Sequence, residues 1–177
     1  MFKIESKHET ELSKQEREEL LTILNNSFDG VFGSQIFFKQ IPHLRYFVKG
    51  NDKIIAHVGI DYRGMNLGGK IIFVVGIIDL CVVPNHRRKG WGSELIKHIE
   101  NTYKEKADFL LLFADDHRVY LKNGFTLANN QVSWLGIDKG KTLGIISKNL
   151  DDCLMYKPLN KDALWSIDSL DMMGYLY

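Results

Sequence analysis

The stretch from Ile77 to Glu100 constrains the fold of this chain more than any other. It begins with apolar and β-branched residues typical of a buried strand, stops at Pro84, and passes through a basic, glycine-containing turn into an amphipathic helix. The later run from Asp108 to Phe113 is almost wholly apolar, which suits a strand covered on both faces. A strand, helix and strand in this order predict two parallel strands in one sheet.

The basic turn, residues 85–92, leads into the N-terminus of the predicted helix. Unpaired backbone N–H groups and the positive end of the helix dipole favour an anion there, and phosphate is the commonest candidate. Gly90 and Gly92 let the backbone approach a ligand, and Arg87, Arg88 and Lys89 add attraction. The glycines could instead only close a tight turn, with the basic residues as a solvated surface.

Two other phosphate-binding motifs do not match this turn. A dinucleotide site is disfavoured because G-x-G-x-x-G is absent after a first strand, as is the acidic ribose ligand expected about 20 residues later. A P-loop is excluded because G-x-x-x-x-G-K-[ST] is absent.

Hydrophobic periodicity predicts helices and strands along the rest of the chain. Helices are expected at residues 9–28 (ending near Asn25), about 91–106 and 115–123, and a short helix or loop at 34–40. Strands are expected at 44–49, 53–62, 71–83, 108–113 and, less clearly, near 132–137, 143–146 and 153–157. The last twenty residues form an apolar tail without a clear pattern. We expect one domain, 1–177, of mixed α+β class.

Composition narrows the classes of partner. The chain has 177 residues, 45% of them hydrophobic and 25% charged, and a net charge of +1, so nothing favours nucleic acid. Cys81 and Cys153 form neither a disulfide framework nor a metal-ligand pattern, and we expect no metal. The N-terminus lacks a signal-peptide core, and no run of about 20 apolar residues predicts a membrane span. A cytoplasmic protein fits best.

Two motifs together carry a family resemblance. The segment Leu80-x-Val82-x-Pro84-x-x-Arg87-x-x-Gly90-x-Gly92 resembles the acetyl-CoA signature of the GNAT N-acetyltransferases. Downstream, Tyr120 stands four residues before Gly124-Phe125, which resembles the family's second hallmark. The resemblance covers about two thirds of the chain and implies a mixed, mostly antiparallel sheet, in which the strand ending at Val83 and the strand 109–113 splay apart around the pantetheine of coenzyme A.

The resemblance also implies a set of acetyl-CoA contacts. The pyrophosphate would lie on the backbone N–H groups of Arg88 to Gly92. The full set comprises the end of the strand, the turn and the start of the helix: Leu80, Cys81, Val82, Val83, Arg87, Arg88, Lys89, Gly90, Trp91, Gly92 and Ser93.

Transfer to an amine requires a neutral amine and protonation of the departing thiolate. By resemblance Tyr120 is the acid, because it occupies the position from which the family's tyrosine meets the sulfur. Asp79 is the candidate base or water-binding residue, with a structural hydrogen bond as the alternative and His57 and His117 as second choices. We interpret Cys81 as a small core residue rather than a nucleophile. This interpretation favours direct transfer in a ternary complex.

One position departs from the family pattern. Members of the family often carry an Asn seven residues before the tyrosine, where it bonds the pantetheine, and this chain has Phe113 there. That contact is in doubt, and Asp115 or Asp116 is expected to cap the short helix instead.

The acceptor is the least constrained prediction. It is expected to be a primary amine of a small molecule or peptide, and a faint similarity to aminoglycoside 2′-N-acetyltransferases suggests an aminosugar as an alternative. An acidic rim of Asp151, Asp152, Asp168 and Asp171, or a pocket lined by Phe32, Phe37, Phe38 and Trp134, are the candidate binding surfaces. A catalytically silent acyl-CoA sensor is the other functional alternative. A homodimer is common in the family, but the sequence does not decide it.

Overall fold

The computed structural model describes residues 2–177, so the first residue of the expected domain lies outside the described part. The chain forms two compact units. The first unit ends at Asp61 and resumes from Ile77 to Ile99, and the second contains Tyr62–Gly76 and Glu100–Tyr177. Strands β3 (Lys53–Leu67) and β4 (Lys70–Val82) therefore contribute residues to both units.

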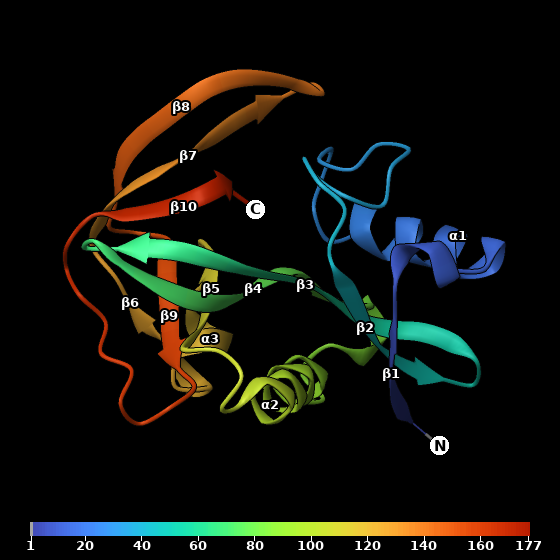
Figure 1. Ribbon diagram of the computed structural model, residues 1–177. Coiled ribbons are helices and arrows are strands. Elements are labelled where there is room, and N and C mark those ends of the chain that lie inside the picture. Colours follow the sequence, from blue (N-terminus) through green and yellow to red (C-terminus); the bar gives the residue numbers. More distant parts are fainter. Residues whose placement is uncertain (1) are drawn as a thin grey trace. The chain divides into compact units, whose positions relative to one another are not determined.

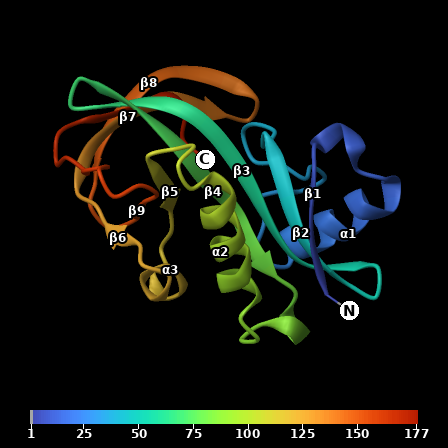
Figure 2. The same cartoon turned by 60° about the horizontal axis from the view of Figure 1, so that its bottom comes forward.

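Helix α1 and strands β1 to β3 build the first unit. In Figures 1 and 2, α1 lies beside β1 and β2, and the apolar side of α1 packs on Phe47 and Ile54 in the core of this unit. Its elements, besides parts of β3 and β4, are β1 (Lys3–Lys7), η1 (Glu9–Glu11), α1 (Lys14–Asn25), β2 (Leu44–Gly50), η2 (Pro84–His86) and most of α2 (Trp91–Tyr103).

The first helix begins later than its hydrophobic pattern predicts. Ser13 is the N-cap, and its side chain accepts a hydrogen bond from Glu16 N at 3.2 Å, while the Glu16 carboxylate accepts one from Ser13 N at 2.8 Å. This reciprocal capping box starts the helix at Lys14, so the predicted start at residue 9 is wrong. The predicted end at Asn25 is confirmed, and residues 34–40 form bends and turns rather than a helix.

The second unit is built mainly from strands around an apolar core. Its elements, besides parts of β3 and β4, are β5 (Phe109–Phe113), α3 (Arg118–Lys122), β6 (Thr126–Leu127), β7 (Asn130–Asp138), β8 (Lys141–Leu150), β9 (Leu154–Pro158) and β10 (Leu170–Tyr175). Strands β7 and β8 form a long hairpin (Figure 1). The apolar tail thus contains a strand, β10, which pairs with β7 and with the end of β3.

Hydrogen bonds join the described strands in the order β6-β9-β5-β4-β3-β10-β7-β8, with β1 and β2 branching from β3. The parallel pairs are β4–β5 and β7–β10, and the pairs β1–β2, β2–β3, β3–β10, β5–β9, β6–β9 and β7–β8 are antiparallel. The predicted mixed, mostly antiparallel sheet is confirmed, as is the parallel relation of β4 and β5. Their pairs end at Gly76 and Leu111, before either strand ends.

The short helix α3 is only five residues long, Arg118–Lys122, and shorter than expected. Gly124 follows its C-cap with φ +81°, as expected for a helix-ending glycine. The Asp116 carboxylate accepts a hydrogen bond from Arg118 N at 3.1 Å, but the N-cap itself is His117, without a side-chain bond.

Candidate functional site

The last two residues of the basic turn, Trp91 and Gly92, belong to α2, which begins directly after Gly90. Glu94 N donates to Gly90 O at 3.0 Å, which is the first hydrogen bond of the helix. The backbone N–H groups of Trp91 and Gly92 precede that bond, so the helix itself gives them no acceptor. Helix α2 has 13 residues, and its dipole adds positive potential at this end. This end of α2 has the donors that an anion site requires.

The backbone of the turn leaves space beside Gly90. Arg88 and Gly90 have positive φ angles of +60° and +89°, and a Cβ atom on Gly90 would meet no heavy atom within 4 Å. Arg88 is exposed, whereas Arg87 Nε donates to Val82 O at 3.0 Å. The first turn of α2 also carries one carboxylate, Glu94. The turn is therefore mainly cationic, and the backbone at Gly90 is open to an approaching ligand.

Two ring nitrogens at this turn are buried without a hydrogen-bond partner. They are Nδ1 of His86 and Nε1 of Trp91, considering the described residues alone. The Trp91 ring packs on Phe2, with centroids 4.6 Å apart. A buried polar group left unpaired costs about 1–3 kcal/mol. The Trp91 indole N–H can only donate, so an acceptor at this position would remove that cost.

The strand residues before the turn differ in how deeply their side chains are buried. Leu80, Val82 and Val83 are partly buried, and the Cys81 side chain is only 5% exposed, within the core that contains the α1 leucines. Burial raises the pKa of the Cys81 thiol, and the neighbouring Asp79 carboxylate adds to the shift. A buried thiol of this kind is a poor nucleophile.

Asp79 interrupts the regular geometry of β4. Its φ is +53°, in the left-handed region that non-glycine residues seldom adopt, which marks a local irregularity in the strand. Strict alternation, which would group Asp79 with Ile77 and Cys81, therefore does not hold at this residue. Burial raises the pKa of the Asp79 carboxyl to about 6, against the opposing effect of the Arg45 charge.

A buried polar cluster lies next to Asp79 in the first unit. The Arg45 guanidinium, with 0% exposure, donates to Glu9 Oε2 at 2.7 Å and to Ile36 O at 2.7 Å, and its Nη1 lies 3.1 Å from His57 Nε2. Because guanidinium only donates, His57 Nε2 must accept, and the proton must be on Nδ1, which lies 3.1 Å from Asp79 O.

The cluster leaves His57 unsuited to proton transfer. Both of its ring nitrogens have partners, and burial together with the Arg45 charge holds the pKa of His57 well below its ordinary value. His57 is a fixed, neutral part of the cluster. The prediction of His57 as a second-choice base is therefore not supported by its geometry.

Tyr120 belongs to the second unit and lies in α3. It is partly buried, and its ring meets Phe125 edge to face at 5.8 Å between centroids. Phe125 N donates to Tyr120 O at 3.1 Å, which fixes the turn through Gly124. His117, at the N-cap of the same helix, places Nε2 2.8 Å from Asp152 O. The Tyr120 ring is thus held by an aromatic contact, whereas the His117 ring is held by a backbone carbonyl.

The candidate acceptor residues are divided between the two units. Phe37 lines a cavity of about 320 Å³ in the first unit, together with Glu9, Lys14, Arg17, Glu18, Leu21, Ser34, Gln35 and Ile36. Phe32 is in the core of the first unit and Trp134 in that of the second. Asp171 accepts a hydrogen bond from Met173 N at 2.8 Å, and Asp168 bonds Ser166 in its own loop. These aspartates stabilise local turns.

Sequence reasoning missed four polar residues of the first unit. They are Glu9, Arg45, Asp61 and His43, of which Arg45 and Asp61 have 0% exposure. Their signal was present in the sequence, because Arg45 and Asp61 are charged residues in strands that otherwise read as apolar. A charge in a buried strand indicates a paired or functional group.

Comparison with known proteins decides the family. A family model described as an acetyltransferase (GNAT) domain matches residues 10–128. The chain belongs to the GNAT acetyltransferase family. The match covers the turn before α2, Tyr120 and Gly124-Phe125, but not β7 to β10.

Solved GNAT structures share the fold at low sequence identity. A GNAT family N-acetyltransferase (YhbS) from Escherichia coli, solved with CoA, has a TM-score of 0.61 and 14% identity, over 97% of this chain and 88% of that one. The ribosomal-protein-S18-alanine N-acetyltransferase from E. coli has a TM-score of 0.55 and 15% identity, over 94% and 100%.

A third GNAT-like structure is much longer than this chain. A probable N-acyltransferase from Enterococcus faecalis has a TM-score of 0.60 and 17% identity over 73% of this chain, but this chain spans only 33% of it. The chain thus spans about a third of the length of that relative.

Within residues 2–177, no group of three or more His, Cys, Asp or Glu side chains is placed to hold a metal ion. No helix there has the length and apolar character needed to cross a membrane.

Proposed function

We propose that residues 1–177 act as one N-acetyltransferase domain, which moves the acetyl group of acetyl-CoA to a primary amine of a small molecule or peptide. The observation that carries this proposal is the turn before α2, in a chain of the GNAT family. Its backbone donors, its open space at Gly90 and its cationic side chains suit the pyrophosphate of coenzyme A. A related fold, YhbS, was solved with CoA.

Direct transfer fits better than a covalent intermediate on cysteine. Burial raises the pKa of the Cys81 thiol, and burial followed by the Asp152 side chain raises the pKa of Cys153 to about 11. Neither thiol is ionised near neutral pH, and the thiolate is the nucleophilic form. The acceptor amine therefore attacks the thioester carbonyl itself in a ternary complex.

The chemical roles follow the sequence-based assignments. The amine nitrogen bonds to the acetyl carbon, the C–S bond breaks, and the departing thiolate takes a proton from the Tyr120 hydroxyl; the proton that the nitrogen loses on forming the amide returns to the Tyr120 oxygen through solvent. Asp79 contacts the acceptor or an ordered water. Burial raises the pKa of its carboxyl to about 6.

The central experiment measures acetyl-CoA binding and transfer in turn. Acetyl-CoA should raise the thermal midpoint of the protein, and S-acetylpantetheine, which lacks the nucleotide and pyrophosphate, should raise it much less. A panel of amines, including peptide amines, polyamines and an aminoglycoside, should then release thiol with at least one acceptor. Absence of stabilisation would overturn the proposal, and stabilisation without thiol release would indicate an acyl-CoA sensor.

A matched pair of glycine variants isolates the turn. Gly90 and Gly140 have positive φ angles of +89° and +73°, and a Cβ on either would meet nothing within 4 Å. Gly90→Ala and Gly140→Ala should therefore cost similar stability, about 1–2 kcal/mol. Only Gly90→Ala should weaken acetyl-CoA binding, by 10-fold or more. Equal acetyl-CoA affinity in the two variants would remove the turn from the site.

The acid is tested with a second matched pair. Tyr120→Phe should lower turnover with little change in acetyl-CoA affinity. Tyr103→Phe, which keeps the stacked ring contact with Tyr62, should leave turnover unchanged. Unaltered turnover in Tyr120→Phe would remove this tyrosine from the mechanism.

A further inference from the structure

The backbone carbonyl of Asp79 ends a chain of hydrogen bonds in the core of the first unit. Arg45 Nε donates to Glu9 Oε2 at 2.7 Å, and Arg45 Nη1 donates to His57 Nε2 at 3.1 Å. His57 Nδ1 then donates to Asp79 O, also at 3.1 Å. All four residues belong to the first unit. The chain thus connects η1, β2, β3 and β4 of this unit through side chains.

The arginine end of this chain is held by further bonds. Arg45 also donates to Ile36 O at 2.7 Å, and Arg17 Nη1 donates to the second carboxylate oxygen of Glu9, Oε1, at 2.9 Å. Arg45 and His57 both have 0% exposure, so bulk water is kept from the bonds between them. The guanidinium is therefore a fixed support for the His57 ring.

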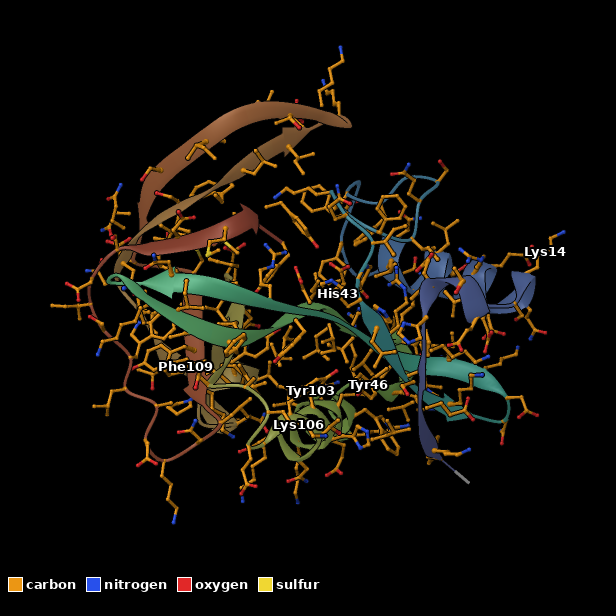
Figure 3. The ribbon with its side chains drawn as sticks, viewed as in Figure 1. Lys14, His43, Tyr46, Tyr103, Lys106 and Phe109 are labelled. Atoms are coloured by element: carbon orange, nitrogen blue, oxygen red, sulfur yellow. The ribbon has the colours of Figure 1, made fainter. Side chains whose placement is uncertain are left out.

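The His57 ring is also fixed by its strand neighbour and by its charge state. Phe47 in β2 pairs with His57 in β3, and the two rings have a centroid distance of 5.4 Å. Figure 3 labels His43 and Tyr46 at the start of β2. Burial and the Arg45 charge hold the pKa of His57 well below its ordinary value. The ring therefore stays neutral near pH 7 and keeps the Nδ1–H that faces β4.

Asp79, at the other end of the chain, has an unfavourable backbone conformation. Its φ of +53° lies in a region that residues with a Cβ seldom adopt. Such conformations persist where the surrounding structure fixes them, and they cluster at functional sites. The residue with the unusual backbone is thus the residue whose carbonyl His57 holds.

The backbone conformation of Asp79 also determines where its side chain points. In a regular strand, successive Cβ atoms alternate between the two faces of the sheet. An irregular residue breaks this alternation, and proteins use such irregularities next to active sites to redirect a side chain. A bond that fixes the Asp79 backbone therefore also fixes the direction of the Asp79 carboxyl.

We propose that His57 is a positioning residue, whose bond to Asp79 O holds this conformation of β4 and so sets the direction of the Asp79 carboxyl during acetyl transfer. This inference rests on the proposed function, in which Asp79 contacts the acceptor or an ordered water. Arg45 fixes the His57 ring, and Glu9 fixes Arg45. His57 itself neither gives nor takes a proton.

Two amide substitutions separate the two bonds of His57. In His57→Asn the amide nitrogen takes the place of Nδ1 and can still donate to Asp79 O. In His57→Gln the amide takes the place of Nε2 and its oxygen can still accept from Arg45. His57→Gln should lower kcat by about 10–100-fold with little change in the KM for acetyl-CoA, whereas His57→Asn should keep most of the wild-type kcat.

The control for this pair is His98→Gln, the same change at a histidine of α2 in the same unit. It should keep the wild-type kcat. Each His57 variant loses one buried hydrogen bond, so both should lose stability in urea denaturation. Equal kcat values in the two His57 variants would overturn the positioning role, because activity would then not depend on the bond to Asp79 O.

A double-mutant cycle shows whether His57 acts through Asp79. Asp79→Asn should lower kcat, and His57→Gln added to it should lower kcat little further, because the carboxyl that His57 positions is already absent. Two effects that multiply in the double variant would overturn the inference. So would a wild-type kcat in Asp79→Asn, since His57 would then have no carboxyl of importance to position.

The bond can also be measured in the wild-type protein, which keeps the inference testable if a His57 variant does not fold. Nitrogen NMR of the His57 ring should show a protonated Nδ1 and an unprotonated Nε2, without titration between about pH 5 and 8. The opposite tautomer, or a ring that titrates in this range, would overturn the inference.

The failures of the two proposals can be told apart. If wild-type protein does not bind acetyl-CoA or transfers acetyl to no amine, the proposed function falls and the positioning role with it. If wild-type protein is active and His57→Gln is equally active, only the positioning role falls.

Discussion

The two units bury different kinds of side chain. Among the described residues, the buried charged or titratable side chains Glu16, Arg45, His57 and Asp61 all belong to the first unit. The second unit buries apolar and aromatic residues, with Phe109 edge to face on Trp165 at 5.1 Å and Tyr156 stacked on Trp165 at 4.4 Å. Among its described residues, the polar side chain Asn130 is buried, and it bonds backbone groups and the Trp165 indole.

The core of the first unit thus contains hydrogen-bonded charges, and that of the second is mainly apolar. Burying a charge is expensive, and a well-packed apolar residue often stabilises a fold as well or better. The second unit is built in this way, with mainly apolar side chains in its core. The first unit is not, because its buried charged or titratable side chains lie on α1, β2 and β3. Removing individual groups tests how much each of them contributes to stability.

The largest effect should follow from Arg45→Met. The change removes a cation with 0% exposure that bonds Glu9, His57 and Ile36 O, and it leaves the Glu9 carboxylate with less compensation. The free energy of unfolding should fall by about 3–5 kcal/mol. Urea denaturation measures this value. The control is Arg118→Met, whose ion pair with Asp116 is exposed and should leave stability unchanged. Equal losses in both variants would contradict the comparison.

The second-largest expected effect is a loss of stability at acidic pH, caused by protonation of Glu16. Burial alone would raise the pKa of this carboxyl, but hydrogen bonds from Lys49, Lys7 and Ser13 lower it to about 2 from 4.5. A lowered carboxyl pKa gives stability that is complete above pH 4.5 and is lost as the pH falls toward 2.

Glu16→Gln should therefore be less stable than wild type by about 2 kcal/mol at pH 6, and the difference should disappear near pH 2. Chemical denaturation across this pH range measures the two curves. Parallel curves at all pH values would show that the Glu16 charge contributes nothing specific.

A smaller effect should test the packing of the second unit. A Cβ on Gly76 would collide with the ring of Tyr177, whose edge-to-face contact with Phe113 has a centroid distance of 5.6 Å. Gly76→Ala should cost about 1–3 kcal/mol, and Tyr177→Ala in the same chain should relieve most of that cost. Gly64→Ala is the control, since its Cβ would be 3.7 Å from Ile71, an ordinary contact. Additive costs for Gly76→Ala and Tyr177→Ala would disprove the contact.

The sequence predicts those parts of the molecule that depend on local pattern. The β4–turn–α2–β5 order follows from periodicity and from Pro84 and Gly90, and the parallel pairing of β4 with β5 is confirmed. Strand β1 could not be found this way, because its residues Lys3–Lys7 are mostly polar and pair only through the backbone of β2. The cluster around Arg45 was missed because its partners, Glu9 and His57, lie 36 and 12 residues away.

The smallest expected change in stability is at Asp79, whose carboxyl has a raised pKa and whose backbone has a positive φ angle. Burial raises the pKa of the Asp79 carboxyl from 3.8 to about 6, so the folded chain holds its proton more firmly than the unfolded chain does. Stability therefore falls as the pH rises from about 4 to 6, and above pH 6 the ionised carboxylate is a net cost.

Asn tolerates the φ of +53° as well as Asp does. Asp79→Asn should thus be about 1 kcal/mol more stable than wild type at pH 7.5 and equal to it at pH 3.5. A variant that is less stable at pH 7.5 would mean that the ionised carboxylate is stabilised in the fold. In that case Asp79 would belong with structural carboxylates such as Glu16.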